Sequence, residues 1–125
     1  MVVGIGLDLM EPARVAKSLE THGPKFEERV YTAAEIADCE HRADRVQALA
    51  ARFAAKEACL KALGTGWSEG LGFRQIEVVR AENGRPELRL TGQAAERARQ
   101  LGARTFHVSL THQPSMAAAV VILES

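Results

Sequence analysis

Apolar and polar positions fall into blocks along the chain that predict strands near both ends and helices between them. Val2 to Leu9 is an apolar run interrupted by Gly4 and Gly6, which is typical of a strand buried on both faces. Residues 105–111 and 116–123 predict two further strands joined by a short turn. We therefore expect the chain to begin and end in strands.

Helical periodicity and end signals fill much of the interval. Pro12 is well placed as the first residue of a helix. Thr32 and Glu35 have the capping-box spacing that starts another helix. Gly64 is placed to end the longest periodic segment. The pattern predicts helices over residues 12–21, from 32 to about 42, 45–63 and 91–100.

Between the last two helices the pattern changes. Residues 64–72 hold four glycines and predict a loop that can move. Residues 73–80 alternate as a strand, Asn83-Gly84 is a strong hairpin signal, and residues 87–90 follow as the partner strand. The predicted fold class is α+β, with one long central helix packed on a small, mainly antiparallel sheet.

Composition narrows the classes of function. The chain has 125 residues, 46% of them apolar, and a formal net charge of zero. A chain of this length buries roughly two-thirds of its unfolded surface, so we expect one domain spanning residues 1–125. Zero net charge argues against a broad nucleic-acid or anionic-membrane partner and leaves only local patches for anions.

Localisation follows from what the sequence lacks. No apolar run approaches the roughly twenty residues that span a bilayer, and the N-terminus resembles no signal peptide. Cys39 and Cys59 are isolated and lack metal-ligand spacing. We expect both thiols to be reduced in a cytoplasmic protein.

Charged side chains interrupt the predicted central helix. Glu57 and Lys61 are four residues apart and share a stripe with Ala50 and Ala54, whose small side chains let another backbone or a ligand come close. Read alone, this pair is most often a weak surface contact worth about 0.3–0.5 kcal/mol. The alternative is a chemical site beside the core.

Asp8 has two interpretations as well. A carboxylate that ends a strand is often the cap of the next helix. Together with a helix carboxylate such as Glu57, it also offers the oxygen ligands that Mg²⁺ prefers. His112 directly follows a predicted strand but has no neighbour at metal-ligand spacing, and no GxSxG motif supports a serine hydrolase.

Several segments in order resemble a known family, the holo-acyl-carrier-protein synthases, which are the small single-domain class of 4′-phosphopantetheinyl transferases. The resemblance covers nearly the whole chain, and the FAxKEAxxKA-like segment is the most specific part. The matching segments are GLDL at 6–9 with Arg14 six residues after Asp8, RFAAKEACLKALG at 52–64, NGRP at 83–86 and HVSLTH at 107–112.

The resemblance implies a Mg²⁺-dependent transferase of fatty acid biosynthesis. Such an enzyme moves the phosphopantetheine arm of coenzyme A to a serine of apo acyl carrier protein and releases adenosine 3′,5′-bisphosphate. It implies Asp8 and Glu57 as metal ligands, and Asp8, Glu57 and Lys61 as catalytic residues, with Glu57 activating the serine directly or through a metal-bound water. The implied coenzyme A contacts are Arg52, Lys56, Lys61, Gly64, Asn83, Gly84, Pro86, Ser109 and His112. Arg14 and Lys17 are the implied contacts to the carrier protein.

The resemblance also implies a homotrimer with coenzyme A in the cleft between subunits. Two other functions stay open at this point. The same carboxylates would serve a Mg²⁺-dependent phosphodiester hydrolase acting on coenzyme A. A non-enzymatic subunit that binds coenzyme A would use the cationic residues without turnover.

Overall fold

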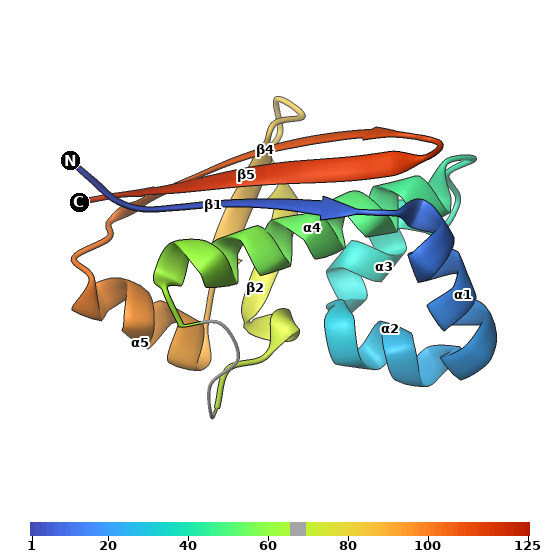
Figure 1. Ribbon diagram of the computed structural model, residues 1–125, viewed down its shortest axis with the longest axis horizontal. Helices are drawn as coiled ribbons and strands as arrows, with labels where there is room; N and C mark the ends of the chain where they lie inside the picture. Colours follow the sequence, from blue (N-terminus) through green and yellow to red (C-terminus); the bar gives the residue numbers. More distant parts are fainter. Residues whose placement is uncertain (66–69) are drawn as a thin grey trace.

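The computed structural model describes residues 1–65 and 70–125 (Figure 1). Its elements are β1 (Val2–Met10), α1 (Pro12–His22), α2 (Pro24–Val30), α3 (Ala33–Cys39), α4 (Arg45–Leu63), η1 (Phe73–Gln75), β2 (Ile76–Arg80), β3 (Pro86–Leu90), α5 (Gly92–Gln100), β4 (Thr105–Gln113) and β5 (Met116–Glu124). The predicted long helix has the observed bounds, and Gly64 ends it in the left-handed conformation.

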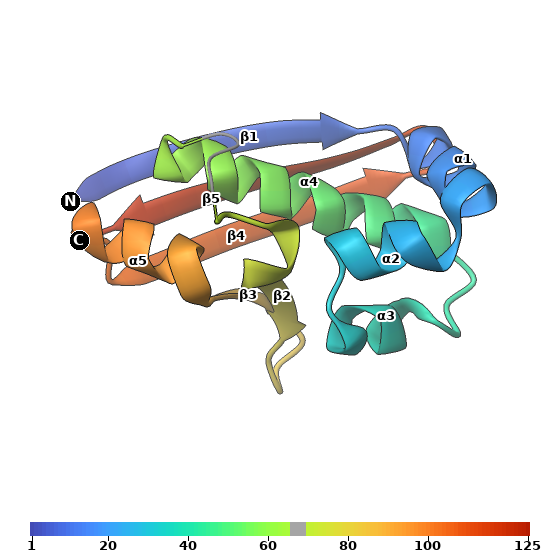
Figure 2. The same ribbon diagram turned by 90° about the horizontal axis from the view of Figure 1, so that it is seen from below.

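The two ends of the chain build the main sheet. β1, β5 and β4 are adjacent in that order and antiparallel throughout, with Asp8 opposite Ala119 and His112 opposite Ala117. Figures 1 and 2 show α4 running along one face of this sheet, with α1, α2 and α3 gathered at one end and α5 at the other. The predicted α+β class, with a long helix on a small antiparallel sheet, is confirmed.

Two glycines bring β1 close to α4. A Cβ atom added to Gly6 would lie 1.8 Å from the Ala58 carbonyl oxygen, and one added to Gly4 would lie 2.2 Å from that of Ala62. Only a residue without a side chain fits such an approach. The small residues of α4 thus admit the backbone of β1 rather than a ligand, and Ala54 is itself fully buried.

The prediction that β1 is buried on both faces is wrong for the single chain. Ile5, Leu7 and Leu9 are 60–65% exposed, whereas the alternate residues face α4. Within the described ranges, no second layer covers the outer face of the sheet. The main sheet therefore leaves an apolar outer face.

Two local elements differ from expectation. Pro24 begins α2, a helix that the residue pattern did not predict because it follows α1 after the single residue Gly23. Phe73–Gln75 forms a 3-10 turn instead of the start of a strand, since the Phe73 carbonyl accepts hydrogen bonds from the Ile76 amide and from Lys56. The predicted moving loop includes residues 66–69, which lie outside the described residues.

The hairpin and helix-start signals are confirmed, although α3 ends at Cys39 instead of near residue 42. Gly84 turns the β2–β3 hairpin with φ of 85°, and Thr32 and Glu35 form the capping box of α3. Cys39 and Cys59 are free and buried. No helix in the described part of the chain is long and apolar enough to cross a membrane.

Candidate active site

The sequence-predicted site residues fall into two groups on opposite sides of α4. Ala48 and Glu57 are nine residues apart, about two and a half helical turns, so they point in opposite directions. Glu57 lines a cavity on the side of β1 and α1, and Ala48 lines a second cavity on the side of the β2–β3 hairpin. We call these the carboxylate pocket and the arginine pocket.

The carboxylate pocket joins the beginning of the chain to the middle of α4. Asp8 of β1 and Glu57 of α4 line a cavity of about 250 Å³. The remaining lining residues come from β1, α1, α2 and α4, and they are Leu9, Met10, Arg14, Val15, Ser18, Phe26 and Phe53. The β1 pleat puts Asp8 on the face toward α4, because Gly6 and Met10 on that face are also buried.

Lys61 neutralises Asp8 rather than Glu57. Its Nζ donates to Asp8 Oδ1 at 2.9 Å and to the Leu7 carbonyl at 3.0 Å. Burial raises the pKa of Glu57 to about 7, and the neighbouring Asp8 carboxyl adds to the rise, while Lys61 and Arg14 oppose it. Glu57 is therefore placed to gain or lose a proton near neutral pH.

The second oxygen of Asp8 is left without a partner. Asp8 Oδ2 is buried and accepts no hydrogen bond in the part of the chain that the structure describes. An orphaned carboxylate oxygen beside a second carboxylate suits a hard divalent cation, which needs only one or two protein carboxylates when water and phosphate oxygens supply the rest. The pair of Asp8 and Glu57 thus fits Mg²⁺.

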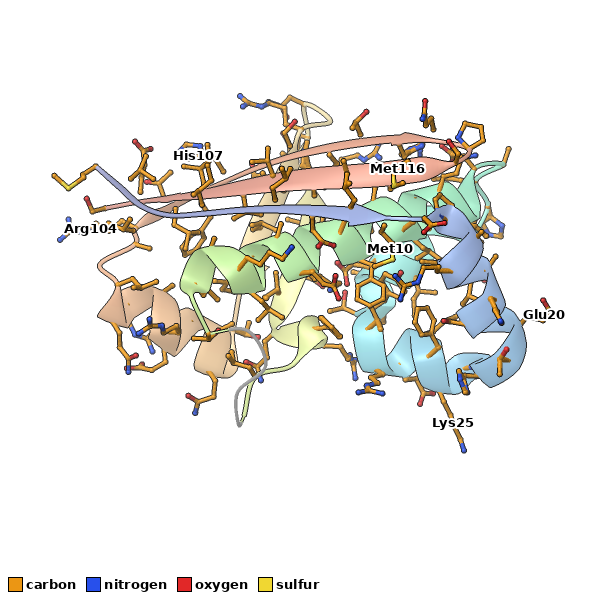
Figure 3. The ribbon with its side chains drawn as sticks, in the orientation of Figure 1. Met10, Glu20, Lys25, Arg104, His107 and Met116 are labelled. Atoms are coloured by element: carbon orange, nitrogen blue, oxygen red, sulfur yellow. The ribbon has the colours of Figure 1, made fainter. Side chains whose placement is uncertain are left out.

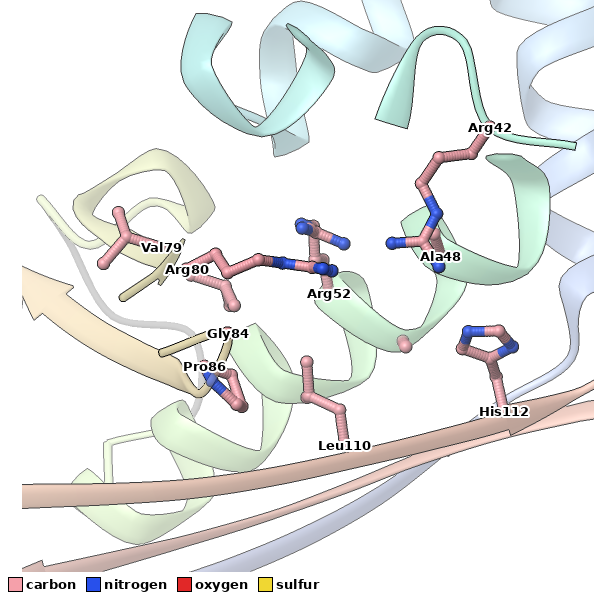
Figure 4. A pocket seen from close by; sticks show the side chains of 11 residues that line it. Arg42, Ala48, Arg52, Val79, Arg80, Gly84, Pro86, Leu110 and His112 are labelled. Carbon is pink, nitrogen blue, oxygen red and sulfur yellow. The ribbon is translucent and has the colours of Figure 1, made fainter. Parts of the chain in front are cut away.

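The arginine pocket lies between α4, the hairpin, the segment before α4, and β4. Figure 4 shows Arg42, Arg52 and Arg80 reaching into a cavity of about 200 Å³ with His112 at one side. The other lining residues are Ala48, Ala51, Val78, Val79, Gly84, Pro86 and Leu110. Three guanidinium groups at one cavity suit a phosphate-bearing anion.

Hydrogen bonds hold Arg42 and His112 at the edge of the arginine pocket. Arg42 donates to both Asp44 carboxylate oxygens at 2.8 and 2.9 Å, which lowers the pKa of Asp44. His112 contacts Gln47 Oε1 through Nδ1 at 3.1 Å. Arg52 is 4% exposed, and its Nε has no hydrogen-bond partner within the described residues. This buried donor is free to meet a bound anion.

The structure thus brings together four of the predicted coenzyme contacts. Arg52, Gly84, Pro86 and His112 all line the arginine pocket. Sequence reasoning missed Arg42 and Arg80. Arg42 lies in the segment between α3 and α4 and Arg80 ends β2, and only the packing of these segments against α4 reveals that they share a cavity.

Other predicted contacts lie elsewhere. The prediction for Lys56 is wrong, because its ammonium is fully buried and already bonded to protein acceptors. Ser109 lies on the outer face of the sheet beside Leu7, whereas His112 faces the arginine pocket, so the structure separates the two.

Two further predicted contacts lie in a turn and at a helix end. Asn83 accepts a hydrogen bond from the Arg85 amide within the hairpin turn. Gly64 caps α4.

A shallow basic groove adjoins the carboxylate pocket. Arg14, Lys17, Ser18, Thr21 and His22 line it along α1. Arg14 and Ser18 also line the carboxylate pocket. A macromolecule seated on α1 would therefore lie next to Asp8 and Glu57. Figure 3 shows the polar side chains projecting from α1 and α2 at this end of the molecule.

Comparisons with known proteins agree on one family. Residues 4–119 match the model described as the 4′-phosphopantetheinyl transferase superfamily. A holo-[acyl-carrier-protein] synthase of Methylobacterium radiotolerans is 53% identical over 129 residues, covering 100% of this chain and 95% of the relative. The synthase of Solibacter usitatus is 46% identical over 125 residues, with 100% of both chains covered.

Solved structures agree as well. The holo-[acyl-carrier-protein] synthase of Neisseria meningitidis superposes with a TM-score of 0.90 at 30% identity, covering 100% of both chains. That of Bacillus anthracis, in complex with coenzyme A (3′,5′-ADP), gives a TM-score of 0.82 at 35% identity, covering 100% of this chain and 98% of the other.

Proposed function

The chain belongs to the 4′-phosphopantetheinyl transferase superfamily, and from that premise we propose that it is a holo-[acyl-carrier-protein] synthase. It transfers the 4′-phosphopantetheine of coenzyme A to a serine of apo acyl carrier protein, and the whole of residues 1–125 acts as one transferase domain. Relatives that carry this name align along the full chain, and one of the similar structures contains coenzyme A.

The observation that carries the proposal is the meeting of Asp8 and Glu57. Two carboxylates from distant segments share one cavity, one of them with an orphaned oxygen and the other with a pKa of about 7. Phosphoryl transfer depends on positioning and on neutralising phosphate charge more than on a covalent catalyst. The carboxylate pocket offers the groups that this chemistry needs.

We assign roles in the carboxylate pocket from this geometry. Asp8 and Glu57 hold Mg²⁺, which when bound neutralises phosphate charge. Glu57 also accepts the proton of the attacking serine hydroxyl, directly or through a water. Lys61 is 57% exposed in its side chain, so its ammonium can turn from Asp8 toward the reacting phosphate.

The nucleotide end of coenzyme A binds the arginine pocket. Arg42, Arg52, Arg80 and His112 supply cationic or hydrogen-bonding groups there, and Gly84 and Pro86 give the hairpin wall. Asn83 and Gly64 remain predicted contacts at the edges of this site. The arginines suit phosphate because a guanidinium presents paired donors to phosphate oxygens.

The site is proposed to form between two copies of the chain. The carboxylate and arginine pockets lie on opposite sides of α4, so one coenzyme A that reaches both draws them from different copies. The apolar outer face of β1, with Ile5, Leu7 and Leu9 exposed, supplies the surface for such an assembly. We propose a homotrimer.

Acyl carrier protein is proposed to dock on α1. Arg14 and Lys17 line the basic groove beside the carboxylate pocket, which places an incoming serine near Glu57. A carrier of acidic surface would associate through charge complementarity, so its binding should weaken as salt rises.

One experiment tests the function against its rivals. Apo acyl carrier protein is incubated with coenzyme A, Mg²⁺ and the protein, and its intact mass is measured together with the fate of coenzyme A. A carrier that gains one phosphopantetheine supports the transferase. Consumption of coenzyme A without a carrier would indicate a hydrolase, and binding without turnover would indicate a non-enzymatic subunit.

A further inference from the structure

A fully buried ion pair lines neither of the two pockets. Lys56 Nζ lies 2.7 Å from Glu35 Oε1, and both side chains are 0% exposed. The same ammonium donates to the Phe73 carbonyl at 3.0 Å and to the Ile76 carbonyl at 2.6 Å. These three acceptors use every donor of a lysine ammonium.

Both carboxylate oxygens of Glu35 also accept hydrogen bonds from the backbone. Its Oε1 accepts from the Thr32 amide at 2.9 Å and its Oε2 from the Val78 amide at 2.8 Å. Thr32 Oγ1 in turn donates to Glu77 Oε2 at 2.6 Å. Lys56 lies on α4 and Glu35 on α3, and their hydrogen bonds reach η1 and β2. The pair therefore links four elements directly.

A buried ion pair of this kind adds little to the free energy of unfolding by itself. Moving two charges out of water costs several kcal/mol per ion, and a well-packed apolar pair of similar volume is often as stable. Burial lowers the pKa of Lys56, although Glu35 opposes that fall. Its directional bonds fix where the backbone of the hairpin lies relative to α4.

That backbone forms a wall of the arginine pocket. Val78, whose amide Glu35 holds, lines the pocket together with Val79 and Arg80 of the same strand. Arg52 lies one helical turn before Lys56 on α4 and forms the opposite wall. A shift of β2 would change the separation of Arg52 and Arg80.

We propose that Lys56 and Glu35 are positioning residues that set the spacing of the arginines which bind the nucleotide phosphates. The inference rests on the proposed function, because it takes coenzyme A as the ligand of the arginine pocket. It gives Lys56 a role within the fold instead of the direct phosphate contact that its sequence position suggested. Neither side chain touches the ligand.

The test uses the full chain with adenosine 3′,5′-bisphosphate and coenzyme A as probes. The main variant is the double substitution Glu35→Gln with Lys56→Met, which removes both buried charges while keeping the side-chain lengths. The control is Leu123→Ala, which creates a cavity in an equally buried position near Gly4, away from both pockets. Calorimetry measures bisphosphate binding, and steady-state transfer measures KM and kcat.

We expect the double variant to bind the bisphosphate at least about tenfold more weakly and to raise KM for coenzyme A more than it lowers kcat. The control should lower Tm and leave bisphosphate affinity unchanged. If the double variant does not fold, Glu35→Gln alone is tested in its place. The glutamine side chain keeps one acceptor oxygen and replaces the other with an NH2 donor. We then expect weaker binding in the same direction.

Two results distinguish a failure of the positioning role from a failure of the proposed function. A folded double variant, or Glu35→Gln alone, that binds the bisphosphate as tightly as the wild type would overturn the positioning role and leave the transferase intact. A wild type that binds neither probe would instead overturn the proposed function. Faster amide exchange of Val78 in the ligand-free double variant would support the role independently of any ligand.

Discussion

Lys61 of α4 pairs with Asp8 across the fold, with 2.9 Å between Nζ and Oδ1, and not with Glu57 along its own helix. The spacing of Glu57 and Lys61 made an intrahelical pair the simplest interpretation of the sequence. In the structure Lys61 serves the carboxylate of β1, and Glu57 lies partly buried beside Asp8. The charge arrangement therefore belongs to a site between two elements.

Replacing Lys61 tests that arrangement. We expect Lys61→Ala to lower kcat for transfer by about a hundredfold or more, because a cation beside the reacting phosphate is lost. Stability should change by less than about 1 kcal/mol, since the side chain is more than half exposed. Transfer measured by intact mass and a denaturant curve check both parts. A kcat near the wild-type value would contradict the role, and Lys61→Arg should keep part of the activity.

Replacing the carboxylates tests the metal site. We expect Asp8→Asn and Glu57→Gln each to abolish transfer and the rise in Tm that Mg²⁺ produces in the wild type, because a bound ligand stabilises only the state that holds it. Glu96→Gln is the matched control, since Glu96 is a surface carboxylate of α5 paired with Arg99. A Mg²⁺-dependent rise in Tm that persists in Glu57→Gln would contradict the assignment.

The pKa of Glu57 predicts how the metal-free protein responds to pH. Its pKa in the folded state is about 7, above the ordinary value of 4.5, because burial disfavours the charged form. The folded state thus binds the proton more tightly than the unfolded state does. The stability from this group is present below the unfolded pKa and is lost as pH rises through the folded pKa.

The expected result has two parts. Between about pH 5 and pH 8 the Tm of the metal-free wild type should fall relative to that of Glu57→Gln. Over the same range the Tm gain from Mg²⁺ should grow, since the cation needs the ionised carboxylate. Thermal melts at constant ionic strength measure both. A pH profile of the wild type parallel to that of Glu57→Gln would show that Glu57 does not titrate in this range.

The approach of β1 to α4 predicts a large effect from one methyl group. In Gly6→Ala the new Cβ would meet the Ala58 carbonyl oxygen at 1.8 Å, so β1 has to move away from α4. We expect a loss of about 1–3 kcal/mol in the free energy of unfolding and a further loss of transfer, because Asp8 moves with the strand. Gly72→Ala is the control, as nothing lies within 4 Å of its added Cβ. Equal stability of the two variants in urea would contradict the prediction.

How far the sequence predicted the fold and site depends on the range of the interactions. Local signals gave the bounds of α4, the Thr32 cap and the hairpin at Gly84, because each depends on neighbouring residues. Lys56 was misassigned because its partner Glu35 is 21 positions away and nothing in the local pattern marks a lysine as buried.

The same limit applies to the arginine pocket. Arg42 and Arg80 gave no signal, since a surface arginine and a pocket arginine look alike until packing brings their elements together. Asp8 and Glu57 were open candidates from the residues alone, and the resemblance to a family supplied the long-range pairing that periodicity lacks.

The final prediction concerns the two sides of α4. Glu57 lines one pocket, and Arg80 and His112 line the other, so an active site assembled between copies takes each half from a different chain. One parent variant is Glu57→Gln. The other combines Arg80→Ala with His112→Ala. Each alone should show little transfer, because every site in the proposed trimer would contain one damaged half.

Coexpression of the two parents should restore activity. In trimers of random composition, each half of a site is intact half of the time, so about a quarter of the sites carry both intact halves. We therefore expect about a quarter of wild-type kcat after coexpression, and no gain when separately purified parents are mixed under conditions that prevent exchange. If each chain built its own site, no chain in the mixture would be intact. Activity that stays at the level of the parents would then rule out a site shared between copies.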